Sequence, residues 1–182
     1  ETLILERTKN RNIVALYALF QASPLILMTT KESGINTIND FSNKKIMTTI
    51  DDSSEVSLKA MIISNKVKVE DLNFLKHTHN INDLLNKNTD IISAYISKAP
   101  FQLNQKSVEY NIFDPKKFGF DMYSDMLYTS ENLINRDLNA VLLFKKASLK
   151  GWEYAYSNIQ ESADLIYKKY NSEKLTKAEL IY

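Results

Sequence analysis

The chain has 182 residues, of which 44% are apolar and 25% charged, and its formal net charge is +1. This composition is typical of one or two globular units with hydrophobic cores. It gives no basis for nucleic-acid binding, which needs a clustered basic face. Cysteine is absent, so disulfide, thiolate and cysteine-ligated zinc chemistry are excluded.

The two ends of the sequence look like the interior of a larger protein. The chain starts without methionine in "ETLILERTKN" and stops in "KLTKAELIY", which resembles an unfinished helix. It contains no signal peptide and no apolar run of the ~18–20 residues that span a membrane. We therefore expect an excised piece of a longer polypeptide.

The first fifty residues predict strands joined by short connections. Two apolar runs, "NIVALYALF" (12–20) and "PLILMTT" (24–30), are typical of buried strands. Thr37 is a candidate cap for a short helix. A third strand is expected in "KKIMTTI" (44–50).

Strands and helices then alternate up to residue 130. The expected elements are a helix at 51–65, a strand within 71–78, a short helix at 80–88, a strand at 90–95, a helix at 97–107, a strand at 108–115 and an aromatic loop entering a strand at 118–130. This alternation predicts βαβ units and a mostly parallel sheet. From 131 to 182 the pattern is helical, with its longest stretch at 136–158.

Polar residues follow the predicted strand at 44–50, in "DDSSEVSLKAMI". Plain capping of the next helix by Asp51 to Ser54 is the favoured interpretation. The alternative is a ligand site above the strand ends. Two acidic residues already complement the helix dipole, so a ligand with an amine or a ring-nitrogen donor would suit Asp51 or Asp52 better than an anion.

Tyr95 stands at the end of the predicted strand in "DIISAYISKAP". One interpretation is a core tyrosine with a satisfied hydroxyl group. The other is a ligand contact, because open α/β sheets bind ligands outside the carboxyl ends of their strands, and a phenol can both stack and donate a hydrogen bond. The residues alone leave both interpretations open.

Two carboxylates, Asp121 and Asp125, lie four residues apart in the aromatic stretch "FGFDMYSDMLYTS". Loop capping and packing is the default interpretation. A single aspartate directed at a polar ligand is the alternative, and a metal site is disfavoured because the spacing of a calcium loop is missing.

Other candidate residues give weaker signals. His77 and His79 are expected at a strand end or facing solvent, because two histidines without a third ligand are a poor metal site. Trp152 and Tyr156 lie four apart on the long helix and predict a core stripe. No catalytic motif and no phosphate-binding glycine loop is present, so an enzyme is the weaker class, and we expect no catalytic residues.

Several separated segments carry a resemblance to a known family. They are "YALFQASPLILMTTKESGINTINDFSNKKI", "AYISKAPF", "YNIFDPKKFGFDMYSDMLYTSE" and "ASLKGWEYA…IYKKYN". Together they resemble the thiamine-pyrimidine-precursor and sulfonate-type periplasmic binding proteins, and most closely those that are sensor domains of bacterial membrane signalling proteins. The resemblance covers nearly all of the chain.

The resemblance implies an α/β fold of the type II periplasmic-binding-protein class. Residues 30–126 would form one complete α/β lobe, and residues 1–29 and 127–182 a partial first lobe with C-terminal helices. The family's opening strands of the first lobe have no counterpart here. A homodimer that completes the truncated lobe is therefore expected, since an unpaired sheet edge invites pairing.

The resemblance also implies the site and its setting. A small polar metabolite would bind in an interlobe cleft, without a cofactor or a metal, lined by Gln21, Ser23, Asp51, Ser53, Tyr95 and Asp125. In "SKAPF" relatives often carry an acidic residue where this chain has Ala99. The implied partner is a membrane-anchored signalling module or, alternatively, the permease of an ABC uptake transporter for a thiamine precursor, sulfonate or similar metabolite. The expected location is the periplasm.

Overall fold

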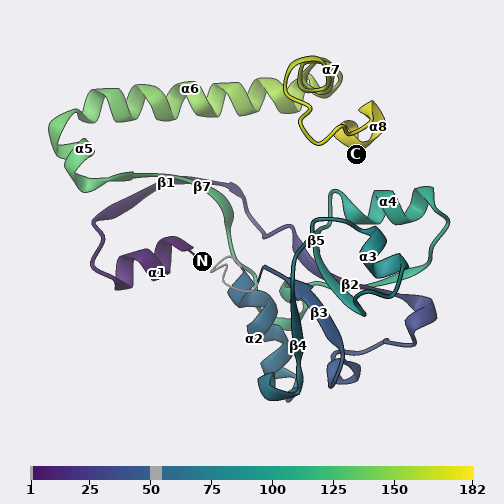
Figure 1. Ribbon diagram of the computed structural model, residues 1–182. Coiled ribbons are helices and arrows are strands. Elements are labelled where there is room, and N and C mark those ends of the chain that lie inside the picture. Colours follow the sequence, from purple (N-terminus) through teal and green to yellow (C-terminus); the bar gives the residue numbers. More distant parts are fainter. Residues whose placement is uncertain (1, 50–54) are drawn as a thin grey trace. The chain divides into compact units, whose positions relative to one another are not determined.

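The computed structural model describes residues 2–49 and 55–182 (Figure 1). The chain divides into two compact units. The first contains residues 1–5 and 20–124, and the second contains residues 6–19 and 125–182. The helix α1 (Thr2–Thr8) spans the boundary between them.

A five-stranded sheet forms the centre of the first unit, with strand order β4-β3-β5-β2-β6. Its strands are β2 (Leu25–Thr30), β3 (Lys45–Thr48), β4 (Asn73–Lys76), β5 (Ile91–Tyr95) and β6 (Tyr110–Phe113). Strand β3 pairs in parallel with β4 and β5, whereas β2 pairs antiparallel with β5 and β6. Four strands thus run one way and β2 opposes them, which confirms the predicted mostly parallel sheet.

Helices cover both faces of this sheet (Figure 1). They are α2 (Val56–Ser64), α3 (Asn82–Leu85) and α4 (Ala99–Gln105), and short 3-10 turns lie at Lys31–Ser33, Ile38–Phe41, Val69–Asp71 and Pro115–Phe118. Successive strand residues point to opposite faces. Leu25 and Leu27 therefore pack with the α2 face of the core, whereas Ile26 and Met28 pack with Leu103 of α4 on the other.

The second unit contains a two-stranded sheet and the C-terminal helices. Strand β1 (Ile13–Phe20) pairs with β7 (Ser124–Ser130). The helices are α5 (Glu131–Arg136), α6 (Leu138–Ser157), α7 (Ile159–Lys169) and α8 (Lys177–Ile181). Side chains cap three of them: Ser130 accepts from the N–H of Leu133, Asp137 from that of Ala140, and Thr176 from that of Glu179.

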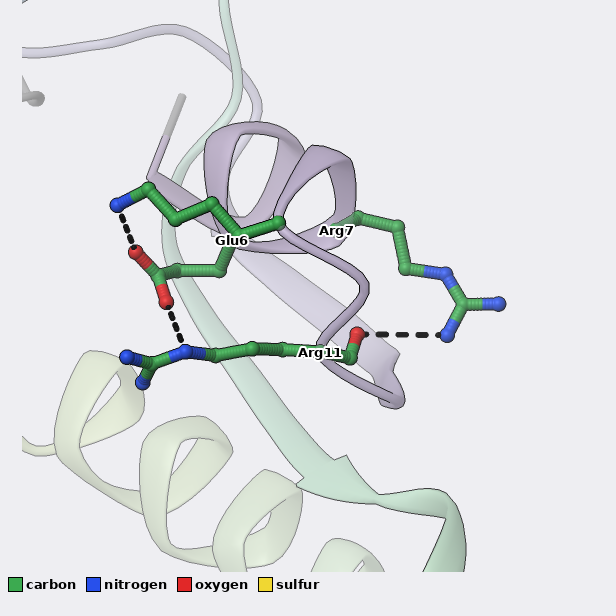
Figure 2. A network of polar contacts seen from close by, with 4 residues as sticks. Glu6, Arg7 and Arg11 are labelled. Atoms are coloured by element: carbon green, nitrogen blue, oxygen red, sulfur yellow. Dashed lines mark hydrogen bonds and ion pairs between the residues drawn. The ribbon is translucent and has the colours of Figure 1, made fainter.

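Charged side chains fix the turn after α1 (Figure 2). The carboxylate of Glu6 lies 2.8 Å from Lys9 Nζ and 2.8 Å from Arg11 Nε, while Arg7 pairs with Glu131 at 2.9 Å. The hydrogen bond from Lys9 and the nearby Arg11 lower the pKa of Glu6, against the opposing effect of desolvation. Ion pairs near the surface and backbone hydrogen bonds from Lys9 and Arg11 to the Glu6 carbonyl oxygen therefore hold the turn.

The predicted core stripe on α6 is wrong. Trp152 is 41% exposed and Tyr156 is 56% exposed, although their rings lie 6.0 Å apart as the spacing predicts. Val141 is the buried residue of this helix. Helical spacing places side chains on a common face, but only tertiary packing decides whether that face is covered.

Most predicted elements form within a few residues of the expected positions. The beginning of the helix expected at 51–65 falls outside the described residues, and its described part starts at Val56. Helix α1 was not expected. The predicted domain boundaries, after residues 29 and 126, stay a prediction. Within the described residues no helix is both long and apolar enough to cross a membrane.

Candidate functional site

The candidate site is the edge of the first unit where parallel strands end. Strand β3 ends at Thr48, β4 at Lys76 and β5 at Tyr95. Strand β2 runs the opposite way, so its first residue, Leu25, pairs with Tyr95. We call this rim, made by Ser23, Thr48, His77 and Tyr95, the carboxyl edge. Open α/β sheets bind ligands at such edges.

Two of the predicted site residues come together on the carboxyl edge. The backbone N–H of Leu25 donates to Ser23 Oγ (3.3 Å), and that of Ile96 donates to the Pro24 carbonyl oxygen (2.9 Å). Ser23 is thereby held beside the end of β5. Tyr95 is 56% exposed, so the interpretation of a core tyrosine is wrong. Its role as a ligand contact stays a prediction.

The structure does not test the grouping of the other four predicted site residues. Gln21 is exposed in the connection between β1 and β2. Asp125 is exposed at the start of β7, in the second unit, with a left-handed φ of 47°. This conformation is uncommon in residues other than glycine, although aspartate tolerates it better than most. Asp51 and Ser53 lie outside the described residues.

A buried carboxylate that the sequence analysis missed lies behind the carboxyl edge. Glu55 is 3% exposed and Ser93 is 2% exposed. Glu55 Oε1 accepts from the Ser93 hydroxyl group (2.9 Å), and Oε2 accepts from the backbone N–H of Thr49 (3.1 Å). Burying a carboxylate is costly unless hydrogen bonds compensate. These two bonds do so, and they join the end of β3, the start of α2 and the middle of β5.

His77 ties the ends of three strands together. It follows β4, its backbone N–H donates to the Thr48 carbonyl oxygen of β3 (3.1 Å), and its Nε2–H donates to the Ser93 carbonyl oxygen of β5 (2.6 Å). Its Nδ1 accepts from the backbone N–H of His79 (2.8 Å). A carbonyl oxygen only accepts and an amide only donates, so the ring is the neutral tautomer protonated at Nε2.

His77 and His79 lie in the connection that follows β4. The two rings stack with centroids 4.5 Å apart, and His79 has a left-handed φ of 60°. Among the residues that the structure describes, no cluster of three or more histidines and carboxylates is placed to hold a metal ion. The pair therefore lies at a strand end, as one of the sequence interpretations expected.

Further polar side chains lie next to this network. The Thr48 hydroxyl group is buried and has no hydrogen-bond partner among the described residues. On the other side, Thr78 donates to the carboxylate of Asp83, and Asn88 donates to it as well (2.7 Å). Hydrogen bonds from Asn88 and Thr78 lower the pKa of Asp83.

Sequence signals for this network existed but were faint. Ser93 is a polar residue inside the apolar run "IISAY", and an inward-facing hydroxyl group in a buried strand needs a partner. Glu55 stands just after the Asp/Ser cluster that drew attention as a cap. Nothing in the spacing indicated that residues 38 apart would meet.

Comparison with solved structures places the fold in the class of periplasmic solute-binding proteins. The aliphatic sulphonate-binding protein SsuA of Escherichia coli matches with a TM-score of 0.73 and 13% identity, over 98% of this chain and 60% of that one. A protein of Bordetella bronchiseptica RB50 matches with a TM-score of 0.73 and 17% identity, over 96% and 58%. A substrate-binding protein of a Streptococcus pneumoniae ABC uptake transporter, with bound histidine, matches with a TM-score of 0.56 and 19% identity, over 94% and 65%.

The family follows from the sequence comparison. The profile described as "NMT1/THI5 like" matches residues 1–162, and the chain belongs to this family. A comparison with curated proteins found no match. The chain spans between 53% and 60% of the lengths of the first four similar structures.

Proposed function

We propose that this chain is a small-molecule-binding domain and that the carboxyl edge of its first unit carries the ligand contacts. The observation that carries the proposal is the exposed phenol of Tyr95, held beside Ser23 at the end of a buried parallel strand. An aromatic ring placed in this way offers a stacking surface and a hydroxyl group to a small polar ligand. Each hydrogen bond to a charged ligand group contributes about 1.5–3 kcal/mol.

A binding role is better supported than a catalytic one. The similar structures include an aliphatic sulphonate-binding protein and a transporter substrate-binding protein with bound histidine. For this chain we therefore propose alkanesulfonates, amino acids and pyrimidine precursors as the ligand classes to test. Gln21, Asp51, Ser53 and Asp125 remain predicted contacts.

Two settings for this binding role are proposed. In the first, the chain is the extracytoplasmic sensor domain of a membrane signalling protein. In the second, it is the solute-binding component of an ABC uptake transporter, which the names of the similar structures favour. Both imply an extracytoplasmic location. The full reading frame distinguishes them, because a membrane-spanning helix joined to a kinase or cyclase module would support the sensor and exclude the free component.

Self-association is the third proposed property. In the described part of the second unit, β1 pairs only with β7, and α6 exposes Leu142, Leu143 and Phe144 by 53% to 64%. Exposed apolar side chains and open sheet edges favour pairing with another chain. Sedimentation velocity over a range of concentrations tests for a homodimer, and Leu143→Glu should shift it to monomer.

Thermal-shift measurement with the three ligand classes tests the binding proposal. A ligand at about 100 times its Kd stabilises by about 2.7 kcal/mol, a shift of roughly 5–10 °C in Tm for a chain of this size. Tyr95→Ala should abolish the shift. Tyr156→Ala is the matched control, because Tyr156 on α6 is also 56% exposed. Binding that persists in Tyr95→Ala would exclude the carboxyl edge as the site.

A further inference from the structure

The hydrogen bonds behind the carboxyl edge form one continuous chain. His79 N–H donates to His77 Nδ1, His77 Nε2–H donates to the Ser93 carbonyl oxygen, and the Ser93 hydroxyl group donates to Glu55. Glu55 in turn accepts from the N–H of Thr49. The chain runs from a half-buried histidine to a carboxylate that is 3% exposed. None of its members was among the predicted ligand contacts.

The neutral form of His77 is required by its Nδ1 contact, in which the ring accepts from the His79 N–H, whereas the Nε2 contact requires only a proton on Nε2. An imidazolium carries N–H groups on both nitrogens, so its Nδ1–H would face the N–H of His79. Two donors cannot share a hydrogen bond, and the ring must turn away. Both contacts depend on one ring orientation, so this turn also withdraws Nε2 from the Ser93 carbonyl oxygen.

The charged groups around His77 have opposing effects on its protonation. Asp83 of α3 bonds to Thr78, the next residue after His77, and Glu55, the N-cap residue of α2, bonds to Ser93. Both carboxylates favour a cationic ring. Lys76, which precedes it on β4, and a protonated His79 stacked at 4.5 Å oppose the cation. The hydrogen-bond geometry, rather than the net field, makes protonation disruptive.

We propose that Glu55, Ser93 and His77 are a positioning network for the carboxyl edge, and that protonation of His77 loosens it. The proposal rests on the proposed function, because it is the ligand-binding edge that the network positions. In the neutral state the network fixes the end of β3 against the start of α2 and β5. When His77 is protonated, its contact with the Ser93 carbonyl oxygen is lost and the ends of β4 and β5 are no longer held together. Ligand binding at the carboxyl edge therefore becomes weaker at acid pH.

Amide exchange in the ligand-free chain tests the network without any ligand. Exchange of the Thr49 and His79 amides, corrected for intrinsic rates, is followed by NMR between about pH 5 and pH 8, where histidine titrates. We expect protection of both amides to fall about tenfold on acidification, the equivalent of one hydrogen bond. The buried Ile46 amide of β3 reports global opening and should keep its protection.

Variants separate coupling from simple destabilisation. His77→Gln keeps an uncharged donor and should remove the pH dependence at both amides. Ser93→Ala cuts the chain in the middle, so it should remove the response at Thr49 and retain it at His79. His79→Gln keeps the backbone N–H and is the matched control, with both responses intact.

Three results would overturn the network. They are an Nδ1–H tautomer of His77 in nitrogen-15 spectra, a Thr49 amide indifferent to pH, or an equal Thr49 response in Ser93→Ala. Binding of ethanesulfonate and L-histidine, measured by calorimetry at the two ends of the pH range, supplies the second arm. If the affinity is unchanged by pH while the protection of the Thr49 amide falls, the positioning role is overturned. If neither ligand binds at either pH, the result counts against the proposed function, and the exchange data alone decide whether His77 is coupled to Thr49.

Discussion

The phenol oxygen of Tyr17 lies 2.6 Å from the hydroxyl oxygen of Ser148, and this hydrogen bond joins β1 to α6 within the second unit. The two residues are 131 positions apart in the chain. Few side chains of this unit are buried, since Val141 and Ala163 are the buried apolar residues that its long helices contribute. A single polar contact therefore carries more weight here than it would in a large core.

Removing that contact should destabilise the second unit. We expect Tyr17→Phe and Ser148→Ala each to lower the free energy of unfolding by about 1 kcal/mol, because each removes one hydrogen bond in a partly buried setting. Urea unfolding followed by far-ultraviolet circular dichroism measures this. The double variant should cost less than the sum of the two single variants, and strict additivity would show that the bond does not form in solution.

The unpartnered hydroxyl group of Thr48 predicts a stabilising substitution. Thr48 is 3% exposed, and no described residue bonds to its Oγ1. Thr48→Val replaces the hydroxyl group with a methyl group of similar shape and should raise stability by about 1 kcal/mol, since an unsatisfied buried polar group costs about 1–3 kcal/mol. Thermal unfolding checks this. Thr89→Val is the control and should destabilise, because the Thr89 hydroxyl group bonds to the Ile91 carbonyl oxygen at 2.8 Å.

The packing of Phe41 predicts that its truncation causes a large loss of stability in the first unit. Phe41 is fully buried and meets Phe113 edge-to-face, with centroids 4.9 Å apart. Phe41→Ala should cost about 3–5 kcal/mol, as is usual for a buried phenylalanine. Phe118→Ala is the control, because Phe118 is 39% exposed. Similar losses in the two variants, measured by chemical unfolding, would contradict this core assignment.

The capping box at Thr37 predicts an acid-sensitive contribution to stability. The carboxylate of Asp40 accepts from the N–H of Thr37 (2.8 Å), from that of Asn36 (3.0 Å) and from the Thr37 hydroxyl group (3.0 Å), and these bonds lower the pKa of Asp40. A carboxyl group whose pKa is lower in the folded state stabilises the protein above its unfolded pKa. This stabilisation is lost as the pH falls through the folded pKa.

Urea midpoints measured from neutral pH down to about pH 3 reveal this contribution, since the ordinary pKa of aspartate is about 3.9. Asp40→Asn should lower the urea midpoint near neutral pH. Below pH 5 the midpoint of this variant should decrease less steeply with pH than that of the wild type. Asn39→Ser, a change at the exposed neighbour, should leave the profile unchanged. Parallel profiles for wild type and Asp40→Asn would show that the cap does not hold a charged carboxylate.

The sequence alone was sufficient for most of the strand and helix pattern, with helix α1 as the exception. Apolar runs such as 25–30 and 91–95 are long enough, and flanked clearly enough, to identify buried strands by local pattern. Their alternation with helices identified a mostly parallel sheet, and separated motifs identified the family. The position of Tyr95 at a strand end follows from the same local information, because it depends on neighbours within a few residues, whereas the reversed direction of β2 depends on its pairing with the distant strands β5 and β6.

Only the tertiary structure decided which polar groups meet and which apolar faces are covered. Glu55 and Ser93 are brought together by the parallel pairing of β3 with β5. His77, which follows β4, reaches the Ser93 carbonyl oxygen across the end of β3, which lies between β4 and β5. Trp152 and Tyr156 have core-like spacing and yet are exposed. The physical reason is the same in both cases: a local pattern specifies the face on which a side chain lies, whereas burial and partnership depend on segments that are distant in the chain.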